Sequence, residues 1–377
     1  MSEGDPFFGL PTELCCAVLR DWLLLDSVVR LDSAVCRTVT RALLLNTIFV
    51  SPQCVLSQGS SYHFYQRENF EWLHLRKLRV VGLHFTWDVD DKVWEYLLSY
   101  GESIKKISFS RCNMGTYLPL ISAHCNSILC LSFVEVMHNF SVQDIALFSR
   151  NLKALDMTET LITDDNLKQI LKQCPALTHI SVAACSSLYE DVGRMLGRHL
   201  KHLRFLDISN TALWDNALVT IANNHYTTLE ELHMEYCDGV NGSDINVLLQ
   251  KCTKLWSLHT TYHDTYFKDF DFSLLCNLTE LSIIDLNETE SYLHSVVQHS
   301  KRLKRFRLNF QDSPPRARNS KWFSITQLNV QRMPELKVFA PFGMLEKDVK
   351  RFSLLRPEVE IVSAHDLFSP SLFEMKW

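Results

Sequence analysis

Residues 203–211 read Leu-Arg-Phe-Leu-Asp-Ile-Ser-Asn-Thr, and this spacing of apolar residues recurs along most of the chain. The shared pattern is L-x-x-L-x-L-x-x-C/T, in which positions one, four and six are apolar. Six strict copies and five looser copies recur about every 26 residues. A constant period of this length indicates stacked repeats, in which each repeat contacts only its neighbours. The strict copies begin at residues 104, 128, 152, 177, 203 and 229, and the looser ones at 75, 255, 278, 303 and 336.

Each copy of the pattern predicts a short β-strand. Positions four and six alternate as strand residues do, so their side chains lie on one face, and position one packs beneath them. Between the strands, residues 167–174 and 245–252 place apolar side chains at i, i+3, i+4 and i+7, which is the stripe of an amphipathic helix. Stacked strand–helix repeats predict a curved solenoid with a parallel sheet on its concave side and helices on its convex side.

The repeats resemble the cysteine-containing subclass of leucine-rich repeats. A buried free cysteine behaves as a small hydrophobe, so packing alone accounts for many of the twelve thiols. The predicted fold class is therefore an α/β leucine-rich-repeat horseshoe solenoid of about eleven repeats over residues 75–345, with a C-terminal cap over residues 346–377. The cysteines that end predicted strands or helices are Cys112, Cys174, Cys185, Cys237 and Cys252.

Residues 7–49 do not follow the repeat and predict two or three short helices. Pro11 suits the first turn of a helix, and Glu13 lies near the positive end of that helix dipole. The segment from Leu10 to Arg37 resembles an F-box, and the order of the two parts is that of the F-box/leucine-rich-repeat family. Residues 50–74 are expected to connect them.

The F-box resemblance implies a Skp-type adaptor as partner, and through it a cullin ligase scaffold. The apolar residues that match the motif are expected to be divided between the core of the module and an exposed patch. The alternative is that these helices only cap the apolar end of the solenoid, as terminal repeats require. The candidate adaptor-binding residues are Leu10, Pro11, Leu14, Val18, Leu19 and Val35.

Positions three, five, seven and eight of each repeat are expected on the concave face. The middle repeats place acids, histidines and tyrosines there, whereas the outer repeats place Lys106, Arg305 and Arg307 at two basic rims. This pattern favours a protein ligand with a basic segment that contacts the tyrosines, because aromatic residues dominate interface hot spots. A solvated charged face without a ligand is the alternative. The candidate substrate-binding residues are Asp156, Asp207, Glu231, His233, Glu235, Tyr236, His259 and Tyr262. The later repeats also place Glu280 and Asp285 on this face.

The composition excludes several classes of function. Thirty-eight Lys and Arg against 43 Asp and Glu give a net charge of −5, which provides no general attraction to nucleic acid or an anionic membrane. The chain has no C-x-x-C pair and no catalytic motif such as G-x-S-x-G or H-E-x-x-H. We expect no metal, no cofactor and no enzymatic activity of its own.

The sequence has no apolar stretch of about 18 residues and no secretory signal, so we expect a cytoplasmic protein. The basic tract of residues 312–321 leaves a nuclear location open. The resemblance implies the substrate-recognition subunit of an SCF-type (Skp–cullin–F-box) E3 ubiquitin ligase, which holds an unidentified protein substrate for ubiquitin-dependent degradation. The alternative is a leucine-rich-repeat scaffold or inhibitor without ubiquitin-ligase association.

Overall fold

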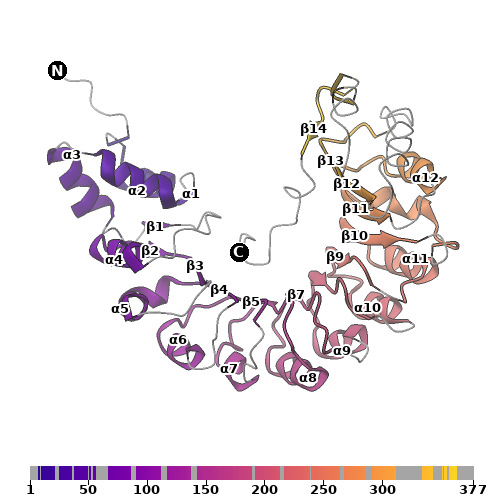
Figure 1. Cartoon of the computed structure of the whole chain (residues 1–377), viewed down its shortest axis with the longest axis horizontal. Coiled ribbons are helices and arrows are strands. Elements are labelled where there is room, and N and C mark those ends of the chain that lie inside the picture. The colour runs from indigo at the N-terminus through magenta and orange to yellow at the C-terminus, as the bar shows by residue number, and fades with distance from the viewer. Residues whose placement is uncertain are drawn as a thin grey trace. The chain divides into compact units, whose positions relative to one another are not determined.

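The chain forms two compact units, one within residues 7–156 and one within residues 157–362. In each unit, parallel strands follow one another in chain order, and helices or turns lie on one side of them (Figure 1). Each unit therefore has the α/β architecture of a leucine-rich-repeat solenoid, as the sequence predicts. The structure, a computed structural model, describes residues 7–8, 10–21, 25–35, 38–49, 51, 54–56, 67–85, 91–111, 117–136, 142–188, 192–212, 216–237, 239–263, 267–285, 291–310, 333–342, 350, 352–354 and 356–362.

The N-terminal unit begins with three short helices. They are α1 (Thr12–Asp21), α2 (Leu25–Ala34) and α3 (Thr38–Leu43), and a π-helical turn over Leu44–Ile48 follows α3 directly. The Cys16 thiol donates a hydrogen bond to the carbonyl oxygen of Ile48 at 3.8 Å, which ties α1 to the end of this segment. A small apolar core fills the space between the helices, and it includes Cys15, Cys16, Leu19, Val28, Leu44 and Ile48.

The described parts of the predicted connecting segment, residues 50–74, include regular structure. Strand β1 (Val55–Leu56) pairs in parallel with β2 (Arg79–Val80), and helix α4 covers Arg67–Leu75. Within α4, the buried Phe70 ring lies 6.4 Å from Phe85 and 5.8 Å from Tyr96. Helix α4 thus shares a core with the first repeats.

The repeats of the N-terminal unit stack through their strands and their core rings. Strands β3 (Gly82–Phe85), β4 (Lys106–Ser110), β5 (Cys130–Val134) and β6 (Ala154–Asp156) pair in this order, and α5 (Asp91–Tyr100), α6 (Leu118–His124) and α7 (Val142–Ala146) lie between them in sequence. Position six is phenylalanine in three successive repeats. The stacked rings of Phe85, Phe109 and Phe133 have centroids 5.3 and 5.7 Å apart, so they form a continuous apolar ladder.

The first repeat begins later than the sequence predicts. The ladder pairs Leu83 with Ile107 and Phe85 with Phe109, so Leu83 is position four and Val80 is position one. The predicted first position, Leu75, is 72% exposed at the end of α4. Shifting the start to Val80 makes the interval to the next repeat 24 residues, which is closer to the intervals that follow.

The described residues of the C-terminal unit form eight strands that pair in chain order. Equivalent positions face one another, as in Leu206 opposite Leu232 and Leu232 opposite Leu258. The strands are β7 (His179–Ser181), β8 (Phe205–Asp207), β9 (Glu231–Met234), β10 (Ser257–Tyr262), β11 (Glu280–Asp285), β12 (Arg305–Phe310), β13 (Val338–Phe342) and β14 (Glu360–Ile361).

Helices cover one side of these strands. The predicted amphipathic segments lie in α8 (Asp164–Gln173) and α11 (Gly242–Lys251), whose apolar residues are buried. The other helices are α9 (Val192–His199), α10 (Ala217–His225) and α12 (Ser291–His299), and a 3-10 helix covers Phe272–Asn277. Thr163 and Asn241 cap α8 and α11 by accepting hydrogen bonds from backbone amides of their first turns.

A left-handed turn ends the strand in every strict repeat. Position eight has φ between 54° and 58° in all six, although none of these residues is glycine. Left-handed backbone costs a non-glycine residue roughly 1–2 kcal/mol, so the surrounding contacts must stabilise the turn. The six residues are Arg111, Glu135, Glu159, Ala184, Asn210 and Tyr236.

Position nine supplies such a contact. The Thr160 hydroxyl donates to the carbonyl oxygen of Met157 in its own repeat at 2.8 Å, and the Cys185 thiol of the next repeat donates to the same oxygen at 3.0 Å. A small side chain with a hydrogen-bond donor is therefore favoured there, which explains the C/T of the pattern. Thr211 and Cys237 donate in the same way to Ile208.

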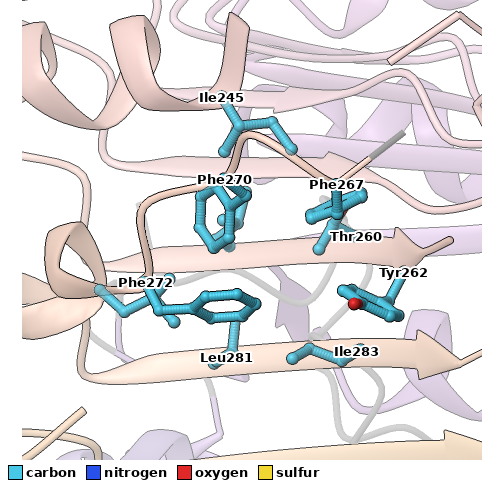
Figure 2. Close-up of a pocket in the computed structure, with 10 residues that line it drawn as sticks. Ile245, Thr260, Tyr262, Phe267, Phe270, Phe272, Leu281 and Ile283 are labelled. Atoms are coloured by element: carbon cyan, nitrogen blue, oxygen red, sulfur yellow. The ribbon is translucent and has the colours of Figure 1, made fainter. Parts of the chain in front are cut away.

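The later repeats lack this residue at position nine, and their strands continue further. β10, β11 and β12 each contain six residues, and position eight remains in the extended strand. Phe267, Phe270 and Phe272 of the segment after β10 pack against the core side of β10 and β11, where they surround a small apolar pocket (Figure 2). Gly242 permits this packing, because a Cβ there would lie 2.7 Å from the Phe270 backbone nitrogen.

The stacking continues into the predicted C-terminal cap. β14 lies within residues 346–377, and it pairs with β13 through Val338 opposite Glu360 and Phe339 opposite Ile361. The Phe339 ring lies 5.0 Å from Phe352, and both are buried. The part of the predicted cap that the structure describes therefore includes a further strand on the sheet.

We predict that Leu206→Ala lowers the free energy of unfolding by about 2–5 kcal/mol, because Leu206 is fully buried between two repeats. Urea denaturation followed by circular dichroism measures the change. Leu354→Ala, which alters a leucine that is 84% exposed, is the control and should change stability little. Wild-type stability of Leu206→Ala would contradict the register.

We also predict that His225 makes the protein sensitive to acid. Its side chain is fully buried in α10, no hydrogen bond to either ring nitrogen occurs within the described residues, and burial lowers its pKa to about 4. The unfolded state binds a proton below about pH 6.5 but the folded state does not, so stability falls as the pH falls, by about 2 kcal/mol at pH 5.

His225→Leu should remove this part of the pH dependence, measured as the difference in unfolding free energy between pH 7 and pH 5. His202→Leu, at an exposed position, is the control and should retain the wild-type difference. Equal pH dependence of His225→Leu and wild type would contradict this assignment.

Candidate functional site

The sheet face opposite the core, called the open face below, carries positions three, five and seven of each repeat. Strand alternation places these side chains there because positions four and six point into the core. In the C-terminal unit, position five forms a column of directly paired polar residues, and all but Asp207 are buried. The column from β7 to β12 is Ser181, Asp207, His233, His259, Ser282 and Arg307.

A row of rings crosses the open face of four strands. The centroids of His179 and Phe205 are 6.2 Å apart, those of Phe205 and His233 are 5.0 Å apart, and those of His233 and His259 are 3.9 Å apart. The two histidine rings stack at an interplanar angle of 12°. The row gives this face a strip of rings beside its charged residues.

Three carboxylates surround the end of this row, and we call Glu231, Glu235 and Glu280 the carboxylate cluster. The Glu235 Oε1 atom accepts a hydrogen bond from the Ser282 hydroxyl at 2.9 Å and one from Arg307 Nη1 at 3.4 Å. The His259 Nδ1 atom lies 3.8 Å from the same oxygen. Glu235 therefore joins three strands through one carboxylate.

Glu280 contacts two further side chains, His259 and Arg305. Its Oε1 atom lies 3.3 Å from His259 Nε2, and its Oε2 atom accepts from Arg305 Nη1 at 3.2 Å. Burial alone would raise the pKa of Glu280, but the hydrogen bonds and charges of His259 and Arg305 lower it below the usual value. Glu280 is thus kept ionised, and His259 bridges two members of the carboxylate cluster.

Burial shifts the pKa values of two other groups on this face so that their uncharged forms are favoured. Burial, followed by the charge of Glu280, raises the pKa of Glu231 to about 7. Burial, followed by the charges of His259 and Arg307, holds the pKa of His233 well below its usual value. At neutral pH, His233 is therefore an uncharged ring, and Glu231 is poised between its two protonation states.

The structure brings four predicted site residues together. Glu231, His233, Glu235 and His259 lie on β9 and β10 or directly after β9, in direct contact or through shared partners. Asp207 lies on the adjacent strand β8, where its carboxylate accepts from the Ser209 backbone amide at 3.0 Å. In the N-terminal unit, Asp156 is buried and accepts from the Ser132 hydroxyl at 3.1 Å, so its carboxylate serves the packing of β5 and β6.

The two predicted tyrosines differ in their placement. Tyr236 occupies a left-handed turn and is exposed, as expected for a residue that meets a ligand. The prediction for Tyr262 is wrong, because β10 remains extended through this residue and directs the side chain into the core. Its ring lies 3.8 Å from Tyr292 and 5.1 Å from Phe267 (Figure 2). Asp285 is buried for the same reason and accepts from the Tyr292 hydroxyl.

The later basic rim is also different from the prediction. Arg305 and Arg307 do not form a separate cationic edge, since both pair with the carboxylate cluster. The sequence revealed the charges but not these partners, and it missed Ser282. The repeat register could have revealed these partners. Ser282 occupies position five beside His259, and Arg307 occupies position five beside Ser282.

The predicted adaptor-binding residues of the N-terminal unit are divided between core and surface. Leu19 and Val35 are buried, and Val18 is half-buried. Leu10 and Leu14 are 40% and 53% exposed, and Pro11 is exposed beside them at the start of α1. The module therefore presents large apolar side chains at the N-terminal end of α1.

The buried Asp32 carboxylate fixes the helices of this module to α4. Its Oδ2 atom accepts from the Trp72 indole and from Arg76 Nε, both at 3.0 Å, and its Oδ1 atom lies 3.3 Å from Arg41 Nη2. The residues come from α2, α3, α4 and the turn after α4. One carboxylate thus links the N-terminal helices to α4 and the turn after it.

Most of the described cysteines are buried and serve packing, whereas Cys276 is exposed. Burial raises the pKa of Cys54, Cys125, Cys130 and Cys237 to about 12, so these thiols are protonated at neutral pH. Among the described residues, there is no group of three His, Cys, Asp or Glu side chains arranged to hold a metal ion. No helix in this part of the chain has the length and apolarity needed to cross a membrane.

Some predicted features lie outside the described residues. They are Cys112, the basic tract of residues 312–321 and the residues of the predicted cap beyond 362.

Comparison with one of the solved structures supports the fold. No protein-family model matches the chain. A chain in the crystal structure of the yeast Rad7 and Elc1 complex superposes with a TM-score of 0.55 at 16% sequence identity, covering 94% of this chain and 92% of that chain. The leucine-rich-repeat protein LegL7 of Legionella pneumophila gives a TM-score of 0.41 at 10% identity, covering 75% of this chain and 91% of that chain.

A curated relative is similar to part of the sequence. Tubulin-folding cofactor E of Arabidopsis thaliana is 33% identical over 106 residues, which represent 28% of this chain and 19% of that protein. The chain therefore spans about a fifth of the length of this relative.

We predict that Asp32→Asn lowers the free energy of unfolding by about 3 kcal/mol, because it leaves Arg41 and Arg76 without their buried counter-charge. Thermal and urea unfolding measure the loss. Glu230→Gln, which removes the exposed pair of Arg204 and Glu230, should cost less than about 1 kcal/mol and is the control. Equal effects of the two substitutions would contradict the role of Asp32.

Proposed function

We propose that this protein is a non-catalytic binding subunit of an SCF-type E3 ubiquitin ligase. In this proposal the N-terminal helices dock on a Skp-type adaptor, and the open face of the repeats holds a protein substrate. Ubiquitin transfer is carried out by partner subunits, including the cullin scaffold. The protein itself contributes proximity and orientation, and it works in the cytoplasm or the nucleus.

The observation that carries this proposal is the exposure of large apolar side chains on a module whose core is already filled. Leu19, Val28 and Leu44 are fully buried, so the helices are packed without help from Leu10 and Leu14. Val39 of α3 is 82% exposed and also unnecessary for that core. Exposed leucines clustered at one helix end are typical of a surface that binds another protein.

The repeats provide the second half of the proposal. A leucine-rich-repeat face offers an extended surface, and here it combines a strip of rings with charged groups of both signs. The similar yeast chain was crystallised in a complex of two proteins, Rad7 and Elc1. This is consistent with a repeat protein of this fold that acts by binding partners.

The contacts of Asp32 favour a second candidate function. They join the module to α4, which is what a cap that only covers the first repeat requires. In that case the protein is a scaffold or inhibitor that uses the same open face without a ligase. The two functions differ in whether the exposed leucines of α1 bind an adaptor.

We predict that the full-length protein forms a complex with a purified Skp-type adaptor on size-exclusion chromatography at micromolar concentrations. The double substitution Leu10→Asp and Leu14→Asp should weaken binding by at least about 30-fold, because burying two leucines contributes about 3 kcal/mol or more. Both residues are exposed, so the variant should retain the wild-type unfolding temperature.

Leu354→Asp, at a leucine of the C-terminal unit that is 84% exposed, is the matched control and should bind as wild type does. Failure of the wild-type protein to bind any Skp-type adaptor would contradict the ligase role and favour the cap. Unchanged binding by the folded double variant would show that the proposed surface is wrong.

A further inference from the structure

Three neighbouring strands place Glu231, Ser257 and Glu280 side by side on the open face. The register pairs Ser257 directly with Glu231 on β9 and with Glu280 on β11. Leu232, Leu258 and Leu281, the next residues along each strand, are buried in the core. Strand alternation therefore directs the three polar side chains to the opposite side, with the serine between the two acids.

The Ser257 hydroxyl lacks a hydrogen-bond partner among the described residues. The residue is fully buried, and its Oγ atom accepts and donates no hydrogen bond there. Leaving a buried hydroxyl unpaired is unfavourable, so such groups are rare unless a ligand or water completes them. This hydroxyl lies between Glu231 and Glu280, where its oxygen can accept a hydrogen bond from a ligand.

The Glu231 carboxylate likewise has no hydrogen bond or ion pair within the described part of the chain. The negative charge of Glu280, on the other side of Ser257, raises the pKa of Glu231, and the charge of Glu230 raises it further. His259 and Arg204 oppose this effect only partly, since burial and Glu280 raise the pKa of Glu231 to about 7. In contrast, Glu280 has both His259 and Arg305 as partners. Glu231 therefore lacks a paired cation of the kind that Arg305 provides for Glu280.

We propose that Glu231, Ser257 and Glu280 form a binding site for the guanidinium group of an arginine side chain from the protein held on the open face. This inference rests on the proposed function, because it specifies the ligand of the same face. A guanidinium is planar and carries five N–H donors, so it can donate to carboxylates on either side and to the hydroxyl between them. Arg305 already makes such a contact with Glu280 from the chain itself.

The proposal includes a dependence on pH. Glu231 attracts a cation only when it is ionised, and its ionisation increases as the pH rises through about 7. The other charged groups that face it are Glu230, Glu280, Arg204 and His259. Affinity for a guanidinium should therefore be higher at pH 8 than at pH 6, and this difference should depend on Glu231.

The test uses the full-length protein and N-acetyl-arginine methylamide as the probe, with binding measured by isothermal titration calorimetry. N-acetyl-citrulline methylamide has nearly the same shape without the charge, and N-acetyl-lysine methylamide carries an ammonium instead. We expect saturable binding of the arginine probe at pH 8, weakened at least about 5-fold at pH 6. The lysine and citrulline probes should bind at least about 10-fold more weakly than arginine.

Glu231→Gln should weaken arginine binding about 10-fold at pH 8 and remove the difference between pH 8 and pH 6. Ser257→Ala should weaken it to a smaller extent, about 3-fold, by removing one acceptor. Glu159→Gln is the matched control in an exposed turn of the same unit and should bind as wild type does. Unchanged unfolding temperatures establish that the variants are folded.

Equal binding of arginine and citrulline, or unchanged arginine binding by Glu231→Gln, would overturn the proposal. Equal binding of lysine would overturn its guanidinium specificity, and no binding of the arginine probe by wild type would remove the site. These outcomes leave adaptor binding unaffected, because that experiment measures the exposed leucines of α1. Loss of adaptor binding would in turn leave the arginine measurement unchanged.

Discussion

Parallel hydrogen bonding between equivalent residues of successive repeats is the interaction on which the rest of the structure depends. A single strand and helix of this chain cannot bury its own apolar face, so each repeat uses its neighbour as the other half of its core. The ladder sets Leu206 opposite Leu232, and it thereby also aligns position five of every strand on the open face. The core and the candidate site are two consequences of one register.

Much of this register could be predicted from the sequence, because the apolar positions that repeat along the chain are the positions that pair between strands. The prediction failed where apolar residues matched the sequence pattern but do not lie in a strand that pairs with the next repeat. Leu75 and Leu78 have the spacing of a repeat, but Leu75 ends a helix, and the ladder begins with Leu83 opposite Ile107. Spacing alone does not reveal which apolar residue has a strand neighbour.

Position nine decided whether a predicted ligand-binding residue reached the surface. Cys237 closes a left-handed turn that exposes Tyr236, whereas His263 stands at position nine of the next repeat, and Tyr262 stays in an extended strand that directs it into the core. The sequence contains this signal, since loss of the C/T residue coincides with the longer strands. Charge partners were harder to predict, because Glu235 and Arg307 are 72 residues apart and meet only through the stacked strands.

Hydrogen–deuterium exchange of the full-length protein tests the stacked register most directly. The account predicts that peptides containing β7, β8 and β9 exchange slowly, because backbone amides in each of these strands are bonded to a neighbouring repeat. Exposed segments between them, such as the turn around Tyr226, should exchange faster. Uniformly fast exchange of the three strands, or slow exchange displaced from them by several residues, would contradict the account.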